Sequence, residues 1–209
     1  MNKFKAILFD VDGTLLDTDE WVFEAFNYSL KKHNLAPITK KQLNSLMGNI
    51  LKDCYKILAP NGDLISLCEA HETYQNSRLN LIKAFPKSRK TLKTLKKSGI
   101  KLAAVSSRYA NLIETLKVGK LYEFLEVVIS ADDVKNPKPH PEPLLLALKK
   151  LNVEVKDALM VGDTHIDILA GKAAKVKTAA VTYGFFGKEI AKQNPDFLLD
   201  NLEQLLEII

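Results

Sequence analysis

Five short and largely apolar segments recur along this chain of 209 residues, and patterns typical of helices separate most of them. A run that is apolar at successive positions is typical of a parallel strand covered on both faces. Strands that alternate with helices form a parallel sheet with helices on both faces. The sequence therefore predicts an α/β fold with a doubly wound (Rossmann-like) parallel sheet. The five predicted strands are 5–9, 101–107, 126–130, 158–163 and 178–183.

The interval 17–84 interrupts this alternation. It contains the helical patterns EWVFEAFNYSLKKH and LISLCEAHETYQNSRLNLIKAF, and it has no apolar run suited to a buried strand. A helical insertion directly after the first strand explains both observations. We therefore expect a core made of 1–16 plus 85–209 and a small α-helical cap made of 17–84. The joining segments 14–19 and 82–87 are the expected hinges of a cap that closes over the core.

Composition excludes several classes of protein. The formal net charge of +5 comes mainly from lysines, which lie on the polar faces of predicted helices, whereas nucleic-acid binding favours clustered arginine with interleaved aromatics. No apolar run approaches the roughly 18 residues of a membrane helix, and the N-terminal apolar segment is too short for a signal peptide. Cys54 and Cys68 lack metal-binding spacing. We expect a cytoplasmic protein that binds neither nucleic acid nor membrane, as a monomer or a homodimer.

Two acids follow the first predicted strand, in the segment AILFDVDGTLLDT. Asp10 and Asp12 are two residues apart, so on an extended chain both side chains project to one side. Gly13 then permits a sharp change of backbone direction. An Asp-Gly turn explains this segment equally well when it is taken alone. Paired acids at a strand end also suit phosphoryl transfer, in which one acid attacks phosphorus and the other handles the proton of the leaving group.

Further polar residues follow the other predicted strands, where parallel sheets bind their ligands. A serine hydroxyl and nearby backbone N–H groups can hold phosphate, a lysine can neutralise it, and carboxylates are oxygen ligands suited to Mg²⁺. Each residue alone has an ordinary explanation: a helix cap, a solvated loop lysine or an acidic helix start. Their joint occurrence in this order favours a phosphate site. The residues are Ser106, Ser107, Lys138, Asp163 and Asp167.

These segments resemble the four motifs of the haloacid dehalogenase superfamily of phosphohydrolases, and the likeness spans the whole chain. FDVDGTLLDT resembles the first motif, VSSR the second, NPKPHPEP the third and VGDTHIDILAGKAA the fourth. The helical stretch 17–84 resembles the cap of the subgroup whose cap follows the first motif. The pattern is specific for the superfamily and carries little information about the substrate.

The resemblance implies a role for each residue. Asp10 is then the nucleophile that forms an aspartyl-phosphate, and Asp12 protonates the leaving group and later activates water. Asp10, the carbonyl of Asp12 and Asp163 are the implied ligands of Mg²⁺, while Asp167 supports a bound water or orients the lysine. The implied phosphate-binding groups are Ser106, the amide of Ser107 and Lys138. Dehalogenase chemistry is disfavoured because the chain retains Asp12 and the metal-site acids.

Several activities remain open for a small phosphorylated metabolite. VTYGF and the fourth motif resemble phosphoglycolate phosphatases, which is the leading expectation, and KPHPEPLLLALKKL resembles bacterial pyrophosphatases of the same subgroup. Sugar-phosphate mutases of the family carry a cap histidine where this chain has Val22, so mutase activity is disfavoured. A non-catalytic phospho-accepting module of the receiver type lacks a helical insertion after its first strand. A catalytically silent binding protein usually lacks one of the motif acids, and all are present here. Both non-enzyme alternatives are therefore disfavoured.

The remaining candidates carry weaker signals. Cap aromatics at helical spacing are expected in the core rather than at the substrate: Trp21, Phe23, Phe26, Tyr55 and Tyr74. His165 is a weak candidate for substrate contact, and a position beside the metal site or an exposed one is expected instead, because Mg²⁺ prefers oxygen ligands. His140 is expected to shape the lysine loop, and His33 and His71 carry no signal. The segment 185–187 is a candidate flap between cap and core.

Overall fold

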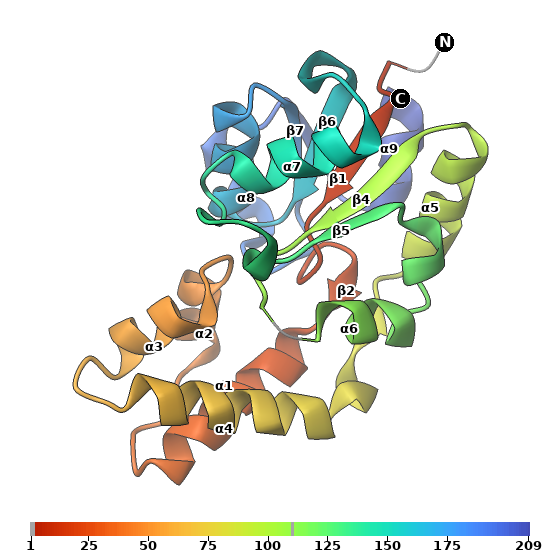
Figure 1. Cartoon of the computed structure of the whole chain (residues 1–209). Helices are drawn as coiled ribbons and strands as arrows, with labels where there is room; N and C mark the ends of the chain where they lie inside the picture. The colour runs from red at the N-terminus through yellow and green to blue at the C-terminus, as the bar shows by residue number, and fades with distance from the viewer. Residues whose placement is uncertain (1–2, 110) are drawn as a thin grey trace.

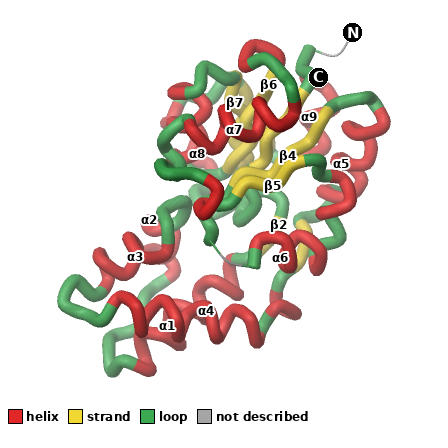
Figure 2. The backbone as a smooth tube through the Cα atoms, viewed as in Figure 1, coloured by secondary structure: helices red, strands yellow, loops and turns green. Residues whose placement is uncertain are grey.

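The computed structural model describes residues 3–109 and 111–209, and its centre is a parallel sheet of six strands (Figures 1 and 2). The strand order is β5-β4-β1-β6-β7-β8, with every neighbouring pair parallel. This arrangement confirms the predicted α/β class. The strands are β1 (Ala6–Phe9), β4 (Lys101–Val105), β5 (Val127–Ile129), β6 (Ala158–Gly162), β7 (Lys177–Val181) and β8 (Phe197–Leu199).

The sixth strand, β8, was not expected from the sequence. Its three residues FLL run from partly exposed Phe197 through exposed Leu198 to buried Leu199, at the edge of the sheet beside β7. An edge strand is covered less completely than a central one, so its sequence need not be long or continuously apolar. This strand therefore gave no signal comparable to that of β1, which is buried at all four positions.

The chain order places β1 at the middle of the sheet. From β1 the chain passes to β4 and then β5 on one side, and β6, β7 and β8 follow on the other. β1 pairs with both inner neighbours, so that Phe9 lies opposite Ala104 and Val161. The order of the strands thus reverses beside β1, and parallel sheets commonly bind ligands beyond the carboxyl ends of the strands at such a point.

Helices cover both faces of this sheet. α5 (Ser88–Lys97) packs with Ile7 and Phe9 in one apolar cluster, and α7 (Glu142–Leu151) and α8 (His165–Ala173) pack with Ala6 and Leu8 in another. Successive residues of β1 thus point to opposite faces, as a strand requires. The remaining helices of this part are α6 (Leu112–Val118) and the short α9 (Leu205–Ile208), with 3-10 turns at 122–124, 131–133, 155–157, 187–193 and 202–204.

The second part of the molecule consists of helices that lie beyond the carboxyl ends of the strands (Figure 1). They are α1 (Asp19–Lys32), α2 (Lys40–Leu46), α3 (Leu51–Leu58) and α4 (Leu64–Ser77), followed by a 3-10 turn at Leu79–Leu81. α1 packs along α4, where Ser29 Oγ donates to the Leu67 carbonyl at 2.7 Å and Trp21 Nε1 donates to the Gln75 carbonyl at 3.0 Å. No helix in the described part of the chain is long and apolar enough to cross a membrane.

A short antiparallel ribbon joins the two parts. β2 (Leu16–Asp17) pairs with β3 (Lys83–Ala84), so the chain leaves and re-enters the sheet domain at adjacent points. Buried side chains run without a break from the sheet into the helices, since Leu15, Leu16 and Trp21 belong to one apolar cluster. We propose that this ribbon is the joint between a cap of 17–84 and a core of 1–16 plus 85–209.

Candidate active site

Two acids lie at adjacent strand ends where the strand order reverses. Asp10 directly follows β1, and its N–H continues the ladder by donating to the Val161 carbonyl at 2.8 Å. Asp163 directly follows the neighbouring strand β6. Both side chains are buried, Asp163 completely. The structure therefore places Asp10 and Asp163, from the first and fourth motifs, at one edge of the sheet.

The loop after β1 packs closely against Asp163. Gly13 has a left-handed φ of +82°, and a Cβ there would lie 2.3 Å from Asp163 Oδ2. Only glycine satisfies both the backbone angle and the close approach. The carboxylate is also oriented by two donors, since Thr14 Oγ1 donates to Oδ1 at 3.2 Å and the Phe185 N–H donates to Oδ2 at 2.8 Å. Asp163 is thereby held in one orientation.

Lys138 reaches the same place from the loop before α7. Its Nζ donates to Asp10 Oδ1 at 2.7 Å, to Asp167 Oδ1 at 2.6 Å and to the Val105 carbonyl at 2.9 Å. The three acceptors use all three N–H donors of the ammonium group. Burial opposes the charge of this lysine, but the negative charges of Asp10 and Asp167 outweigh it and raise its pKa. Lys138 is therefore a buried cation held between two carboxylates.

The acids around Lys138 form a cluster that could hold a metal ion. Asp10, Asp163 and Asp167 each offer a carboxylate oxygen, and these oxygens lie within 4.8 Å of one another. Burial raises the pKa of Asp10 to about 7, against the opposing charge of Lys138. Burial and the charge of Asp10 likewise raise the pKa of Asp163 well above its usual range. Oxygen ligands and excess buried negative charge fit Mg²⁺.

The composition of this cluster differs from the expected ligand set in one respect. Asp167 contributes an oxygen to it, although Lys138, Thr164 Oγ1 at 2.7 Å and the Thr164 N–H at 3.1 Å also bind this carboxylate. The carboxylate of Asp12 is not part of the cluster among the described residues. Its oxygens pair with Arg108 and accept from Thr18 Oγ1 at 2.8 Å. Of the groups of Asp12, the backbone carbonyl is therefore the one that remains a proposed metal ligand, beside Asp10 and Asp163.

Both predicted serines lie at the carboxyl end of β4 and line one cavity together with Asp10 and Asp12. Ser106 Oγ accepts from the Arg108 N–H at 3.2 Å, which bends the chain away from the strand. Ser107 Oγ is buried and has no hydrogen-bond partner within the part of the chain described. A buried hydroxyl without a partner is costly unless a ligand satisfies it. The sequence pointed to the amide of Ser107, and the structure adds its hydroxyl.

The other wall of the cavity, whose volume is about 90 Å³, comes from α1 to α4 and the turn between α2 and α3. Its residues are Val22, Phe26, Leu46, Met47, Gly48, Asn49, Leu51, Cys54, His71, Glu72 and Gln75. Sequence reasoning assigned no signal to His71, because spacing alone does not show which face of α4 meets the core. Arg108 was also missed as a site residue, although its place directly after the serine pair at a strand end offered a signal.

The weaker candidates fall in several places. Trp21, Phe26 and Tyr55 are buried in the core as expected, and Phe26 also lines the cavity. Phe23 and Tyr74 are partly buried. His165 packs against Phe186, with ring centroids 5.1 Å apart, and exposed His140 lies next to the lysine loop, where its Nδ1 accepts from the Glu142 N–H at 3.2 Å. Phe185 is buried against Asp163.

His71 gives the folded protein a specific pH dependence. Burial, reinforced by the positive charge of Arg108, lowers the pKa of His71 from 6.5 to about 3. The imidazole thus stays neutral in the folded state but takes up a proton in the unfolded chain below pH 6.5. Its contribution to stability is present above that pH and is lost as pH falls, on the order of 1.4 kcal/mol for each pH unit.

We therefore expect the difference in free energy of unfolding between His71→Gln and the parent protein to become smaller in acid. At pH 7.5 this variant loses the contact between Tyr55 Oη and His71 Nδ1, which are 3.0 Å apart, and is less stable than the parent. At pH 5 the deficit shrinks by roughly 1–2 kcal/mol, because glutamine has no proton to gain. Urea unfolding of both proteins at the two pH values measures this difference. A deficit that is constant or larger at pH 5 would show that His71 is not held neutral.

Comparison with known proteins agrees with this geometry. A family model described as haloacid dehalogenase-like hydrolase matches residues 7–181. Pyrophosphatase PpaX of Anoxybacillus flavithermus is 35% identical to this chain, covering 99% of it and 97% of the relative. Pyrophosphatase PpaX of Bacillus pumilus is also 35% identical, and the match covers 100% of this chain and 97% of that relative. The crystal structure of a predicted phosphoglycolate phosphatase from Haemophilus somnus matches with a TM-score of 0.92 at 25% identity. This match covers 100% of this chain and 99% of that one.

The family model covers most of the chain, and it includes all four segments that carry the site. The resemblance inferred from those segments is confirmed, as is the expectation of a phosphatase-type enzyme. The chain belongs to the haloacid dehalogenase-like hydrolase family, as a phosphatase of that family.

Proposed function

We propose that this protein is a Mg²⁺-dependent phosphatase that transfers a phosphoryl group to Asp10 and then to water. The observation that carries the proposal is the position of Lys138 Nζ, 2.7 Å from Asp10 Oδ1 and 2.6 Å from Asp167 Oδ1, beside the cavity that Asp10 lines. A cation bound to the attacking carboxylate reduces its repulsion from an incoming phosphate. It also leaves the second oxygen of Asp10 available for attack on phosphorus.

The residues of the chain divide the remaining tasks. Ser106 and Ser107 donate to the oxygens of the phosphoryl group, which is attacked in line by Asp10, and the positive charge of Lys138 offsets the negative charge of that group. Asp12 gives a proton to the leaving oxygen and later takes one from the water that hydrolyses the aspartyl-phosphate. Asp10, Asp163 and the carbonyl of Asp12 would hold Mg²⁺, with Asp167 supporting the site. The ion would supply Lewis-acid stabilisation of negative charge on the phosphoryl oxygens.

We infer that pyrophosphate is the first substrate to test and phosphoglycolate the second. The curated relatives named as pyrophosphatases reach 35% identity over nearly the whole chain. The structural relative named as a predicted phosphoglycolate phosphatase is 25% identical. The sequence motifs alone favoured phosphoglycolate, and the higher identity to pyrophosphatases changes that ranking. Family membership as a hydrolase leaves a non-catalytic phospho-acceptor without support.

Phosphate release from the two substrates, measured side by side, tests this function. With Mg²⁺ we expect turnover of both, with the larger kcat/KM for pyrophosphate. Chelation of divalent ions is expected to lower the rate by about 100-fold or more, since metal ions supply several kcal/mol to such reactions. Adding Mg²⁺ back restores it. Full activity in the chelator would refute metal dependence, and a kcat/KM that favours phosphoglycolate by a large factor would reverse the ranking.

A further inference from the structure

Arg108 extends into the cavity from the segment after β4, and its guanidinium is held on several sides. Nη1 donates to Thr115 Oγ1 at 2.8 Å, and Cζ lies 4.9 Å from the centre of the Trp21 ring. Nε donates to Asp12 Oδ2 at 3.2 Å, and Nη2 pairs with Asp12 Oδ1. The side chain is only 13% exposed. A long and flexible side chain has thus been fixed at the cavity wall.

Both oxygens of Asp12 accept hydrogen bonds. Oδ2 is bound by Arg108, and Oδ1 is shared between Arg108 and Thr18 Oγ1 at 2.8 Å. A general acid needs one oxygen directed at the leaving group within hydrogen-bond reach. The ion pair with Arg108 favours the ionised carboxylate, so it opposes the protonated form of Asp12 that gives a proton to a leaving oxygen. The contacts of Arg108 with Thr115 and Trp21 do not depend on Asp12, and they keep the guanidinium in place.

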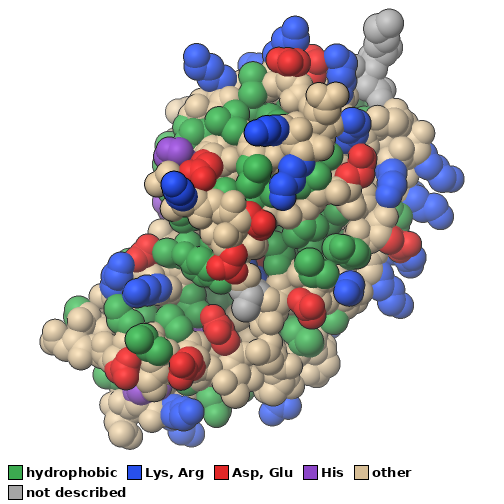
Figure 3. Space-filling view, viewed as in Figure 1, with side chains coloured by type: hydrophobic (Ala, Val, Ile, Leu, Met, Phe, Trp, Pro, Cys, Tyr) green, Lys and Arg blue, Asp and Glu red, His purple; other side chains and the backbone are tan. Residues whose placement is uncertain are grey.

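The charge distribution of the cavity shows what could replace Asp12 beside Arg108. Among the described residues that line the cavity, Arg108 is the one cationic side chain. The helical wall around it is mostly apolar or uncharged, and His71 is kept neutral by burial and the charge of Arg108. In Figure 3, Lys and Arg side chains are scattered over the visible face and do not gather into one patch of the kind that a polyanionic macromolecule requires. The planar fork of arginine suits a carboxylate or a phosphate group.

We propose that Arg108 binds a second anionic group on the leaving-group side of the substrate, and that this binding frees Asp12. This inference rests on the proposed function and narrows its substrate class. The preferred substrates are small phosphate esters or anhydrides whose leaving group itself carries a carboxylate or phosphate. A substrate with a neutral leaving group offers Arg108 nothing in exchange for Asp12. Arg108 is thus a specificity residue for the anionic leaving group.

The chemical step that follows conserves atoms and charge. One oxygen of Asp10 bonds to phosphorus as the bond between phosphorus and the leaving oxygen breaks, and that oxygen takes the proton of Asp12. Water then bonds to phosphorus and passes a proton to the Asp12 carboxylate, and the bond between Asp10 and phosphorus breaks. Phosphate and the protonated leaving group are released, and Asp10 and Asp12 return to their starting states.

A comparison of substrates with and without the second anion tests this inference. The substrates are pyrophosphate, phosphoglycolate and ethyl phosphate, which has a methyl group in place of the carboxylate of phosphoglycolate and therefore releases a neutral alcohol. With Mg²⁺ present, Arg108→Gln is expected to lower kcat/KM about 10- to 100-fold for the first two, the value of a charge-assisted hydrogen bond. For ethyl phosphate, kcat/KM should fall by no more than about threefold, because no contact between this substrate and Arg108 is lost. Arg108→Lys keeps the positive charge but lacks the planar guanidinium, so its kcat/KM for pyrophosphate and phosphoglycolate should lie between those of the parent and Arg108→Gln.

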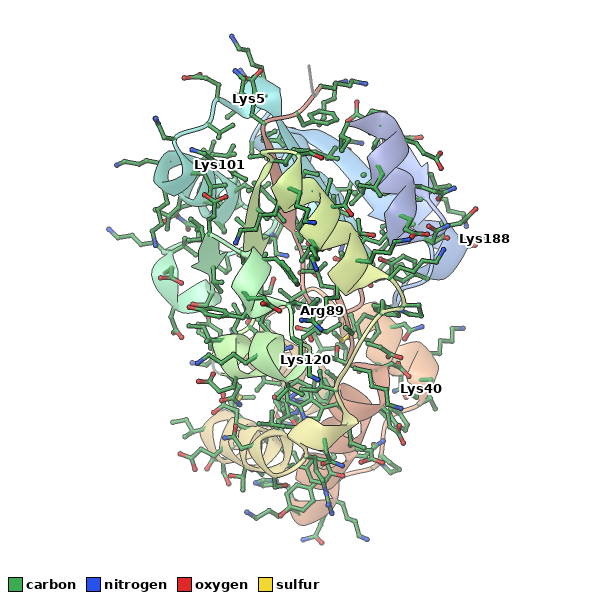
Figure 4. The ribbon with its side chains drawn as sticks, turned by 90° about the vertical axis from the view of Figure 1, so that its right-hand side faces the viewer. Lys5, Lys40, Arg89, Lys101, Lys120 and Lys188 are labelled. Carbon is green, nitrogen blue, oxygen red and sulfur yellow. The ribbon has the colours of Figure 1, made fainter. Side chains whose placement is uncertain are left out.

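A binding measurement separates the effect on recognition from any effect on folding. Methylenediphosphonate carries two linked anionic groups and is not hydrolysed, whereas inorganic phosphate fills only the phosphoryl site. Arg108→Gln is expected to weaken inhibition by methylenediphosphonate about 10-fold or more and to leave inhibition by phosphate unchanged. Arg89→Gln is the matched control: this residue of α5 pairs with Glu123 at 3.0 Å on the surface (Figure 4) and should change neither inhibition constant.

The failure of this inference and that of the proposed function give different results. If the parent enzyme cleaves these substrates but Arg108→Gln loses all three equally, Arg108 merely supports the site and its proposed specificity role is wrong. Unchanged kcat/KM for all three substrates would also overturn that role. If the parent protein with Mg²⁺ cleaves none of them, the proposed function itself fails.

Discussion

Replacing Asp10 with asparagine is expected to lower kcat by at least about 10⁴-fold, the scale seen when a nucleophile is removed. The amide oxygen cannot form the aspartyl-phosphate, and it gives Lys138 a neutral partner in place of the carboxylate at 2.7 Å. Asparagine has nearly the same size, so the end of β1 keeps its packing. Phosphate release from pyrophosphate with saturating Mg²⁺ measures the loss, and mass spectrometry of acid-quenched parent enzyme should detect a phosphorylated peptide containing Asp10.

A surface variant controls for the chemistry of the substitution. Asp53→Asn makes the same change on α3, where Asp53 pairs with Lys56 at 2.7 Å and is 45% exposed. Its activity should stay within about twofold of the parent, since exposed ion pairs contribute little. If Asp10→Asn retained more than about one part in 100 of the parental kcat, far above the residual rate expected without a nucleophile, Asp10 could not be the nucleophile.

Removal of the Lys138 charge is expected to affect both stability and catalysis. Lys138→Met leaves the buried Asp10 and Asp167 without their shared cation, and breaking a buried ion pair in this way costs about 3–5 kcal/mol. The free energy of unfolding, measured with urea in the absence of divalent ions, should fall by that amount. Mg²⁺ should recover part of the loss, because it neutralises the same carboxylates. The kcat of the variant should fall about 10²- to 10³-fold, as for other lost electrostatic stabilisers.

An exposed lysine supplies the comparison for this variant. Lys192 pairs with Glu189 on the surface, and its side chain is 74% exposed. Lys192→Met should change the free energy of unfolding by no more than about 0.5 kcal/mol, as surface substitutions usually do. Equal stability of Lys138→Met and Lys192→Met without divalent ions would contradict a structural role for the buried cation. An undiminished kcat in Lys138→Met would contradict its role at the phosphoryl group.

Local features of the sequence determined the central sheet and the order in which acids, serines and lysine meet its edge. β1 is apolar at each position from Ala6 to Phe9 because both faces of a central parallel strand are buried. Asp10 and Asp163 could be placed near each other because parallel strands present their carboxyl ends at one edge. β8 escaped prediction because an edge strand with an exposed Leu198 lacks that continuous pattern.

The sequence by itself thus determined the α/β class, the helical insertion and the identity of Asp10, Lys138 and Asp163 as a converging set. Only the tertiary structure decided that Arg108 occupies the oxygens of Asp12 while lying over Trp21, and that α4 turns His71 toward the cavity. Strand periodicity and turn chemistry act between near neighbours and can be read from spacing. A contact between Arg108 and Asp12 depends on how the loop after β4 packs against the loop after β1, and packing among distant segments leaves no periodic trace in the chain.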